Sequence, residues 1–239
     1  MRVDKLLANS GYGSRKEVKS LLKGKQITLN GIVIKDGSTH VNPDTDNVEV
    51  NNKKVSYEKY IYLMMNKPQG CLSATKDARD KTVIDLLSDE EKTYQPFPVG
   101  RLDKDTEGLL LLTNDGQLAH ELTSPKKDVK KRYYAKINGE VLNSHVKLFQ
   151  EGLVLKDGYH AKPAWLEIIQ SGNKSEIIVT VTEGKYHQVK RMFEAVDRKV
   201  LYLKRLEMGE LQLDKSLSLG AYRPLTEQEK AYCFSIKRK

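Results

Sequence analysis

The chain has 239 residues, of which 38% are apolar and 31% are charged, and it carries a formal net charge of +9. This apolar content can build a hydrophobic core and excludes a disordered chain. The length fits one large domain, or an ordinary domain with a small one attached. No signal-like segment or membrane-length apolar run is present, and Cys71 and Cys233 form no CxxC pair. We therefore expect a cytoplasmic protein with two free thiols.

The positive charge indicates a polyanionic partner, with an ordinary basic surface as the alternative. Its distribution favours the partner. Net positive charge is denser in the first quarter of the chain than in the rest, and basic residues gather again in the segment 126–132, Lys-Lys-Asp-Val-Lys-Lys-Arg.

Two apolar sets at helical spacing open the chain, at residues 3–7 and 18–22. Gly11 and Gly13 separate them, and Ser14 with Glu17 forms the pattern of a capping box. The segment 26–34 reads as strand, Asn-Gly turn, strand. The sequence therefore predicts a small α+β domain at residues 1–58. Its second helix would expose a group of basic side chains that includes Arg15, Lys16 and Lys19.

The residues 2–8, Ser14-Arg15 and the 27–31 hairpin make this segment resemble the small RNA-binding domain first recognised in a ribosomal small-subunit protein. The resemblance implies RNA binding without catalysis. A basic helix pair beside a small sheet also suits structured RNA, which proteins recognise by shape and phosphate contacts.

The remaining residues, 59–239, predict a second, larger domain. Apolar runs indicate strands at 61–66, 109–112, 133–137, 177–181 and 200–203. Helical patterns occur at 82–87, 117–122, 145–149 and 189–195. Strands outnumber helices without strict alternation, which favours an α+β fold on a mixed, mainly antiparallel sheet.

The first catalytic candidate is Asp103, which lies in a short charged loop ahead of four consecutive leucines. A loop attached to a buried strand holds a reactive group rigidly. Asp103 and Asp105 could act as paired acid and base carboxylates, as in a glycoside hydrolase, or merely shape the turn. Phosphate-loop, HExxH and GxSxG motifs are absent and the histidines lack metal-ligand spacing. We therefore expect no metal and no cofactor.

The segment 100–115, Gly-Arg-Leu-Asp-Lys-Asp-Thr-Glu-Gly followed by four leucines and Thr-Asn-Asp, resembles the signature of pseudouridine synthases. Two further segments, 66–70 and 183–192, are similar to other motifs of that family. The tail 222–226 favours the branch that modifies small-subunit ribosomal RNA. Together with the N-terminal domain, the resemblance covers nearly the whole chain.

The resemblance implies that a uracil is detached, turned and rejoined to its ribose through carbon. It assigns Asp103 as the nucleophile and Tyr133 as the aromatic surface for a flipped uridine. The Asp103 carboxylate would either attack the ribose anomeric carbon or assist departure of the base by a glycal-type route, and the Tyr133 hydroxyl would also help to move the proton released from carbon. Tyr134 would point to the opposite face of the same strand. Lys190 would keep Asp103 ionised, with Arg191 as the competing partner.

The predicted substrate-binding residues are Arg101, Arg191, Lys67, Arg15, Lys16 and Lys19. The expected partner is ribosomal RNA or an assembly intermediate of a ribosomal subunit, and we expect a monomer that does not bind membranes. A large-subunit ribosomal RNA pseudouridine synthase and a non-catalytic RNA-binding assembly factor remain alternatives.

Overall fold

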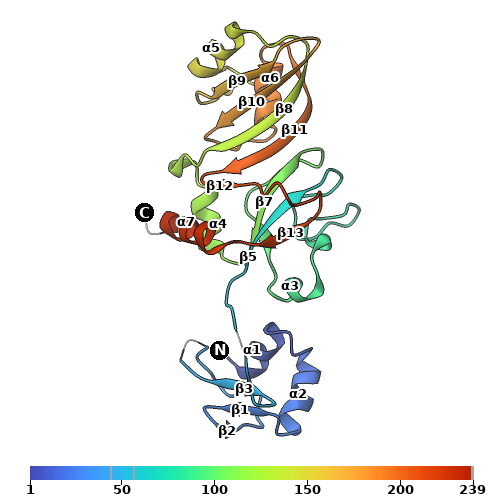
Figure 1. The fold of residues 1–239 in the computed structure, drawn as a ribbon, viewed down its shortest axis with the longest axis vertical. Coiled ribbons are helices and arrows are strands. Elements are labelled where there is room, and N and C mark those ends of the chain that lie inside the picture. Colours follow the sequence, from blue (N-terminus) through green and yellow to red (C-terminus); the bar gives the residue numbers. More distant parts are fainter. Residues whose placement is uncertain (44, 56, 238–239) are drawn as a thin grey trace. The chain divides into compact units, whose positions relative to one another are not determined.

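The computed structural model describes residues 1–43, 45–55 and 57–237. Two compact units divide the chain (Figure 1). One consists of Met1–Ile61 with Ser88–Gln95, and the other of Tyr62–Leu87 with Pro96–Lys239. Within the described residues, no helix has the length and apolar character needed to cross a membrane.

The first unit combines short helices with a small antiparallel sheet of strand order β2-β1-β3-β4. Ser14 caps the second helix, and the reciprocal bond from its backbone N–H to Glu17 completes the predicted capping box. The apolar faces of both N-terminal helices pack on the sheet around a core that includes Leu6, Leu22 and Ile27. The helices and strands of the first unit are α1 (Val3–Asn9), α2 (Arg15–Lys23), β1 (Ile27–Leu29), β2 (Ile32–Val33), β3 (Val48–Val50), β4 (Lys53–Lys54) and α3 (Asp89–Thr93).

The second unit is built on a mixed sheet with the strand order β13-β5-β7-β11-β8-β10-β9, with β6 paired to β7 and β12 paired to β11. The strands are β5 (Tyr62–Lys67), β6 (Phe97–Pro98), β7 (Glu107–Thr113), β8 (Lys131–Asn138), β9 (Trp165–Gln170), β10 (Lys174–Val181), β11 (Lys199–Met208), β12 (Leu211–Gln212) and β13 (Tyr222–Pro224). The helices are η1 (Ile84–Leu86), α4 (Gly116–Thr123), η2 (Pro125–Lys127), α5 (Asn143–Glu151), α6 (Gln188–Glu194) and α7 (Glu227–Lys237). The predicted α+β class is confirmed.

One parallel pair joins two antiparallel parts of this sheet, with Arg205 of β11 opposite Gly108 of β7. All other strand pairs given for the described residues are antiparallel. Gly108 has a φ of 104°, and a Cβ atom there would lie 2.2 Å from the carbonyl oxygen of Arg205. Glycine therefore permits the close approach of the two strands.

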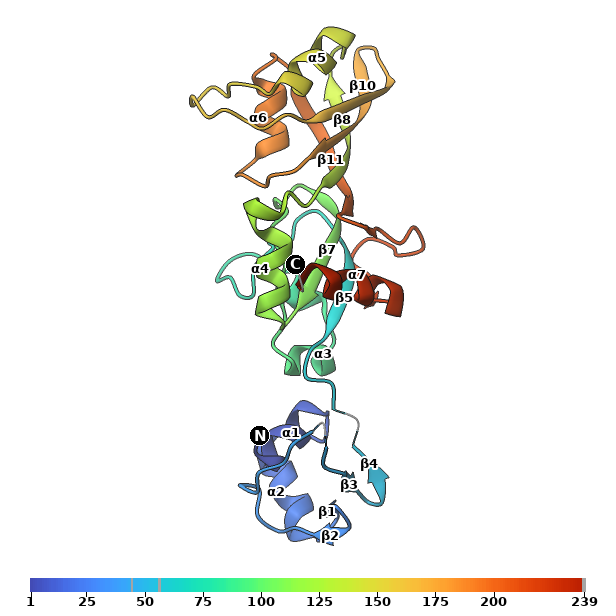
Figure 2. The ribbon, with the colours of Figure 1, turned by 90° about the vertical axis from the view of Figure 1, so that its left-hand side faces the viewer.

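Helices cover both parts of the sheet (Figures 1 and 2). The helix α7 lies beside α4, and its Phe234 ring packs edge-on against Tyr62 of β5 at 5.6 Å. The buried Asp115 carboxylate at the start of α4 accepts hydrogen bonds from Tyr62 Oη and Lys237 Nζ. On the other part, α5 contacts β9 and α6 contacts β11, and Phe149 packs against Phe193 at 4.9 Å between them.

The structure differs from the predicted elements in a few places. The predicted helix at 82–87 is a single 3₁₀ turn, because the side chain of Asp85 bonds back to Thr82 and the backbone of Leu87 is extended. The edge strand β13, the outer strand β9 and the C-terminal α7 were not predicted. The first contains Pro224, and in the second the charged Glu167 interrupts the apolar residues.

Candidate active site

The loop that carries Asp103 is fixed by main-chain and side-chain bonds on both sides. The Thr106 N–H donates to the Asp103 carbonyl at 3.0 Å, which closes a turn. Ser73 Oγ donates to the Leu102 carbonyl and accepts from the Leu102 N–H, at 2.9 and 3.0 Å. The Asp103 side chain therefore leaves a rigid backbone at the entry to β7.

Lys67 lies under this loop and has no exposed surface. Its Nζ donates to the carbonyl oxygens of Pro68, Asp103 and Thr106 at 2.9–3.0 Å. The geometry gives no support to the prediction that Lys67 binds substrate, because its three N–H groups are all directed at backbone oxygens and the side chain does not line the pocket. Burial lowers the pKa of Lys67 to about 8, with the nearby Asp103 carboxylate among the groups that oppose the shift.

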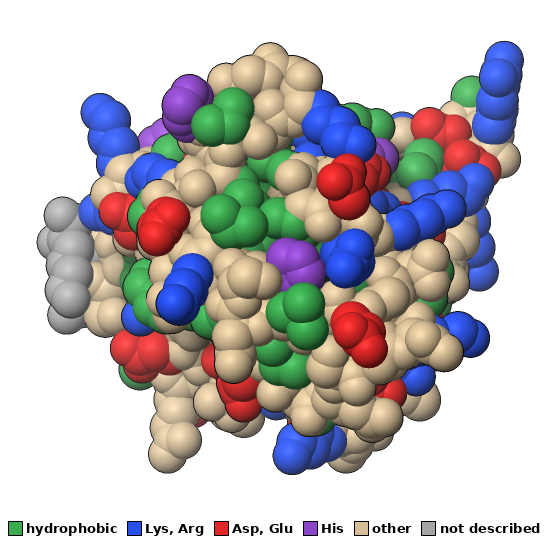
Figure 3. Space-filling view, turned by 90° about the horizontal axis from the view of Figure 1, so that it is seen from above, with side chains coloured by type: hydrophobic (Ala, Val, Ile, Leu, Met, Phe, Trp, Pro, Cys, Tyr) green, Lys and Arg blue, Asp and Glu red, His purple; other side chains and the backbone are tan. Residues whose placement is uncertain are grey.

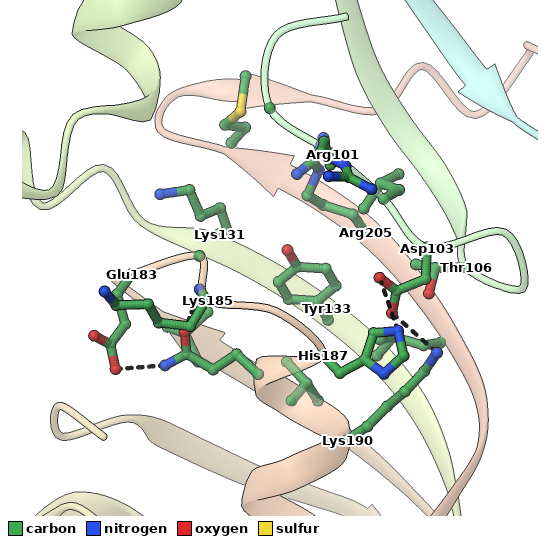
Figure 4. A pocket seen from close by; sticks show the side chains of 18 of the residues that line it. Arg101, Asp103, Thr106, Lys131, Tyr133, Glu183, Lys185, His187, Lys190 and Arg205 are labelled. Atoms are coloured by element: carbon green, nitrogen blue, oxygen red, sulfur yellow. Dashed lines mark hydrogen bonds and ion pairs between the residues drawn. The ribbon is translucent and has the colours of Figure 1, made fainter. Parts of the chain in front are cut away.

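Asp103 faces two basic side chains from the start of α6 (Figure 4). Lys190 Nζ lies 2.9 Å from Asp103 Oδ2 and 2.6 Å from Asp105 Oδ1. His187 Nε2 lies 3.6 Å from Asp103 Oδ1. Burial opposes the charge on Lys190, but the hydrogen bonds to the two carboxylates outweigh it and raise its pKa. Asp103 is thus held beside an ammonium group whose charged form the two carboxylates favour.

The backbone of His187 explains how both side chains reach the same carboxylate. His187 is the N-cap of α6 and has a φ of 48°, in the left-handed region. This turn directs its imidazole toward Asp103, while Lys190 projects from the first turn of the helix. Tyr186 stacks on the His187 ring at a centroid distance of 3.8 Å and is 73% exposed.

Arg191 is directed elsewhere. Its guanidinium pairs with Asp157 and also donates to the Tyr186 carbonyl. It is not among the residues that line the pocket at Asp103. The geometry therefore gives the Asp103 pairing to Lys190, and the prediction of substrate binding by Arg191 is not supported, because its charge is already engaged by Asp157.

Tyr133 lies on β8 and faces the same pocket, whereas its neighbour faces away. The buried positions of β8 alternate with more exposed ones. Tyr133 is 9% exposed and lines the pocket with Asp103. Tyr134 points to the other face. There its hydroxyl donates a hydrogen bond to Glu176 at 2.6 Å, and its ring packs edge-on against the ring of Tyr202.

The pocket has a volume of about 730 Å³ including its open mouth, within the range of small-ligand sites. Four lysine and arginine residues besides Lys190 border it: exposed Arg101 and Lys185, and buried Lys131 and Arg205 (Figure 4). Neither Lys131 nor Arg205 was predicted from the sequence. Lys131 lies two residues before Tyr133 and shares its face of β8, but the predicted strand began at Tyr133 and so left Lys131 out. Among the described residues, no group of His, Cys, Asp and Glu is arranged to hold a metal ion.

The three predicted basic residues of the first unit lie along one helix. Arg15, Lys16 and Lys19 are all exposed on α2. Elsewhere, on the face of the molecule shown in Figure 3, Lys and Arg side chains lie among acidic ones and do not form a single patch. The excess positive charge is therefore not gathered at one place on that face.

Comparison with known proteins agrees with this geometry. Residues 61–195 match the family model of RNA pseudouridylate synthases, and residues 1–47 match the S4 domain. The uncharacterized RNA pseudouridine synthase YtzG of Bacillus subtilis is 54% identical over 96% of both chains. Ribosomal small subunit pseudouridine synthase A of Vibrio cholerae is 38% identical over 97% of this chain and 98% of its own.

A crystal structure of a pseudouridylate synthase superimposes with a TM-score of 0.68, at 34% identity and over 99% of both chains. The similarity thus covers the S4 domain and the second unit, which contains Asp103, Tyr133 and Lys190. The chain belongs to the family of RNA pseudouridine synthases that includes the ribosomal small subunit pseudouridine synthase A enzymes.

Proposed function

We propose that this protein converts a specific uridine of small-subunit ribosomal RNA to pseudouridine, with Asp103 as the nucleophile. The observation that carries the proposal is the pairing of Asp103 with Lys190 in a pocket whose wall is Tyr133. The small-subunit assignment rests on relatives from several bacteria that are named ribosomal small subunit pseudouridine synthase A.

The target uridine would leave the RNA stack and lie against the Tyr133 ring, since base–aromatic stacking offsets part of the unstacking cost. Arg101 is exposed at the pocket and makes no hydrogen bond or ion pair with other described residues. Its free guanidinium is suited to a phosphate of the flipped nucleotide. RNA affinity would come mainly from Arg15, Lys16 and Lys19 in the S4 domain.

Asp103 would form a bond to the ribose C1′ as the C1′–N1 bond breaks and its electron pair leaves with the uracil. After the base turns, its C5 would attack C1′ and release the carboxylate. The C5 proton is then lost and N1 gains one, so the reaction is an isomerisation with no redox change. Lys190, whose Nζ lies 2.9 Å from Asp103 Oδ2, would orient the carboxylate for the attack and stabilise its negative charge when it leaves C1′.

The test replaces Asp103 by Asn and, as a matched control, Asp105 by Asn. Both carboxylates contact Lys190, but the Asp105 side chain is 69% exposed and does not line the pocket. We expect Asp103→Asn to bind RNA normally and to form no pseudouridine in a single-turnover assay. Asp105→Asn should retain most of the activity. Full activity of Asp103→Asn would refute the role of Asp103.

A second measurement identifies the substrate. Pseudouridines in ribosomal RNA are mapped by carbodiimide modification and primer extension, in cells with and without the gene. We expect one small-subunit pseudouridine to disappear. Loss of a large-subunit site would move the assignment to that RNA. A defect in ribosome assembly with an unchanged map would favour the non-catalytic assembly factor.

A further inference from the structure

Two buried cations in the pocket wall make no direct ion pair with a carboxylate of the described residues. Lys131 is 7% exposed, and its side chain makes no hydrogen bond or ion pair with the rest of the described chain. Arg205 is 2% exposed; its Nε donates to the Leu109 carbonyl at 2.8 Å, but its buried Nη2 has no partner among the described residues. Buried charge without compensation is costly, so these groups are the strongest unexplained polar feature of the pocket.

Strand register places both cations next to the predicted stacking ring. Lys131 and Tyr133 are two residues apart on β8 and therefore share a face of the sheet. Arg205 lies directly opposite Tyr133 on the neighbouring strand β11. Figure 4 shows Lys131 and Arg205 on either side of the Tyr133 ring. The two charges are close enough that Arg205 contributes, after burial, to lowering the pKa of Lys131 to about 8.

We propose that Lys131 and Arg205 bind the carbonyl oxygens of the flipped uracil and stabilise the negative charge that the base acquires when its bond to C1′ breaks. This inference rests on the proposed function. The electron pair of the C1′–N1 bond leaves with N1 and is delocalised onto O2 and O4. Fixed cations in a site shielded from water stabilise such charge strongly.

The depth of the two side chains favours the base over a phosphate as their ligand. When a nucleotide is flipped, the base enters deepest and the phosphates stay with the strand outside. Lys131 and Arg205 are buried, whereas Arg101 is exposed. Arg101 is thus placed for a phosphate, and the two buried cations are placed for carbonyl oxygens.

The test compares Lys131→Met with Lys131→Arg, and with Lys136→Met as a matched control. Lys136 is on the same strand but exposed, and it does not line the pocket. With enzyme in excess over the target RNA, Lys131→Met should slow pseudouridine formation about 10²–10³-fold, as removal of one electrostatic donor does in other enzymes. The RNA dissociation constant should change less than about threefold. Lys136→Met should behave as wild type.

The pH profile separates charge stabilisation from a structural role. Lys131 must be protonated, so the wild-type rate should fall as pH rises through about 8. The groups that act on it are Arg205 from β11, Asp128 ahead of β8 and Glu183 after β10. Lys131→Arg should stay active and lose this alkaline fall, because its guanidinium remains charged. Lys67 titrates in the same range but is unchanged in this variant.

Three results would overturn the inference: a wild-type rate for Lys131→Met, an effect on RNA affinity alone, or an unchanged alkaline fall in Lys131→Arg. If Lys131→Met does not fold, the pH profile of Lys131→Arg still decides between charge stabilisation and a structural role for Lys131. Arg205→Lys, which removes the unpartnered Nη2 donor, should also lower the rate without lowering affinity. Failure of the proposed function looks different, since wild-type protein would then form no pseudouridine in any ribosomal RNA.

Discussion

Replacement of Lys67 by Met tests how strongly the catalytic loop depends on one buried ammonium. Methionine keeps most of the length of the lysine side chain, but the change removes three hydrogen bonds to backbone carbonyls. Hydrogen bonds to charged groups contribute about 1.5–3 kcal/mol each. The lowering of the Lys67 pKa from 10.5 to about 8 corresponds to an offsetting burial cost of about 3 kcal/mol. We therefore expect Lys67→Met to lower the free energy of unfolding by about 2–5 kcal/mol.

The assay is urea unfolding followed by circular dichroism, with pseudouridine formation measured under native conditions. Lys104→Met is the control, because Lys104 lies in the same loop but forms only a partly exposed ion pair with Asp80, which contributes about 0–1 kcal/mol. Lys67→Met should also lose activity at temperatures where it remains folded, since three carbonyls of the loop lose their donor. Wild-type stability and activity of Lys67→Met would refute this account.

The same residue gives a pH dependence of stability with a defined sign. Its pKa is lower in the folded protein than in the unfolded chain, so the unfolded state binds more protons between pH 8 and 10.5. The Lys67 contribution to stability should therefore rise with pH across this window. It is measured as the difference between wild type and Lys67→Met, because Lys131 titrates over the same range in both proteins. A difference that shrinks with pH would contradict the assigned burial.

Three further changes test other parts of the structure. Tyr133→Phe should keep the RNA affinity within about threefold, because base stacking is retained. The same variant should slow turnover if the Tyr133 hydroxyl moves the proton released from C5. An unchanged rate would show that the hydroxyl has no such role. Gly108→Ala should lower the free energy of unfolding by about 3–5 kcal/mol, because the new Cβ atom strains the backbone and overlaps the facing strand. Thermal or urea unfolding measures this loss. Gly116→Ala is the control and should be nearly neutral, because Gly116 has open space around it. Combined replacement of the basic side chains of α2 should weaken RNA binding and flatten its salt dependence in filter binding, and an unchanged slope would place the main RNA contacts elsewhere. These side chains are Arg15, Lys16 and Lys19.

The sequence was most informative where a local pattern directly determines structure. Capping by Ser14, the Asn-Gly turn and the buried run of leucines depend on neighbouring residues, and all three occur as predicted. The motif segments also brought Asp103, Tyr133 and Lys190 to one pocket. Their chemical roles remain predictions until the variants are measured.

What the sequence could not reveal is the direction of long side chains. Lys67 and Arg191 both belong to motif segments, yet one is buried under the loop and the other pairs with Asp157. Conversely, Arg205 faces the pocket because it pairs opposite Tyr133 of β8 in a particular register. That register depends on contacts between residues far apart in the chain, which no local pattern contains.

The short parallel pairing of β7 with β11 also has a consequence for folding kinetics. Asp103 precedes β7, whereas Tyr133 lies on β8, so the two belong to different antiparallel parts of the sheet, and the described strands of these parts are joined by this pairing. Each part can form its own secondary structure before they join, and non-local parallel pairing is slow. Catalytic competence should therefore recover later than backbone circular dichroism during refolding. Enzyme activity would then report the final docking step of this protein rather than the formation of its strands.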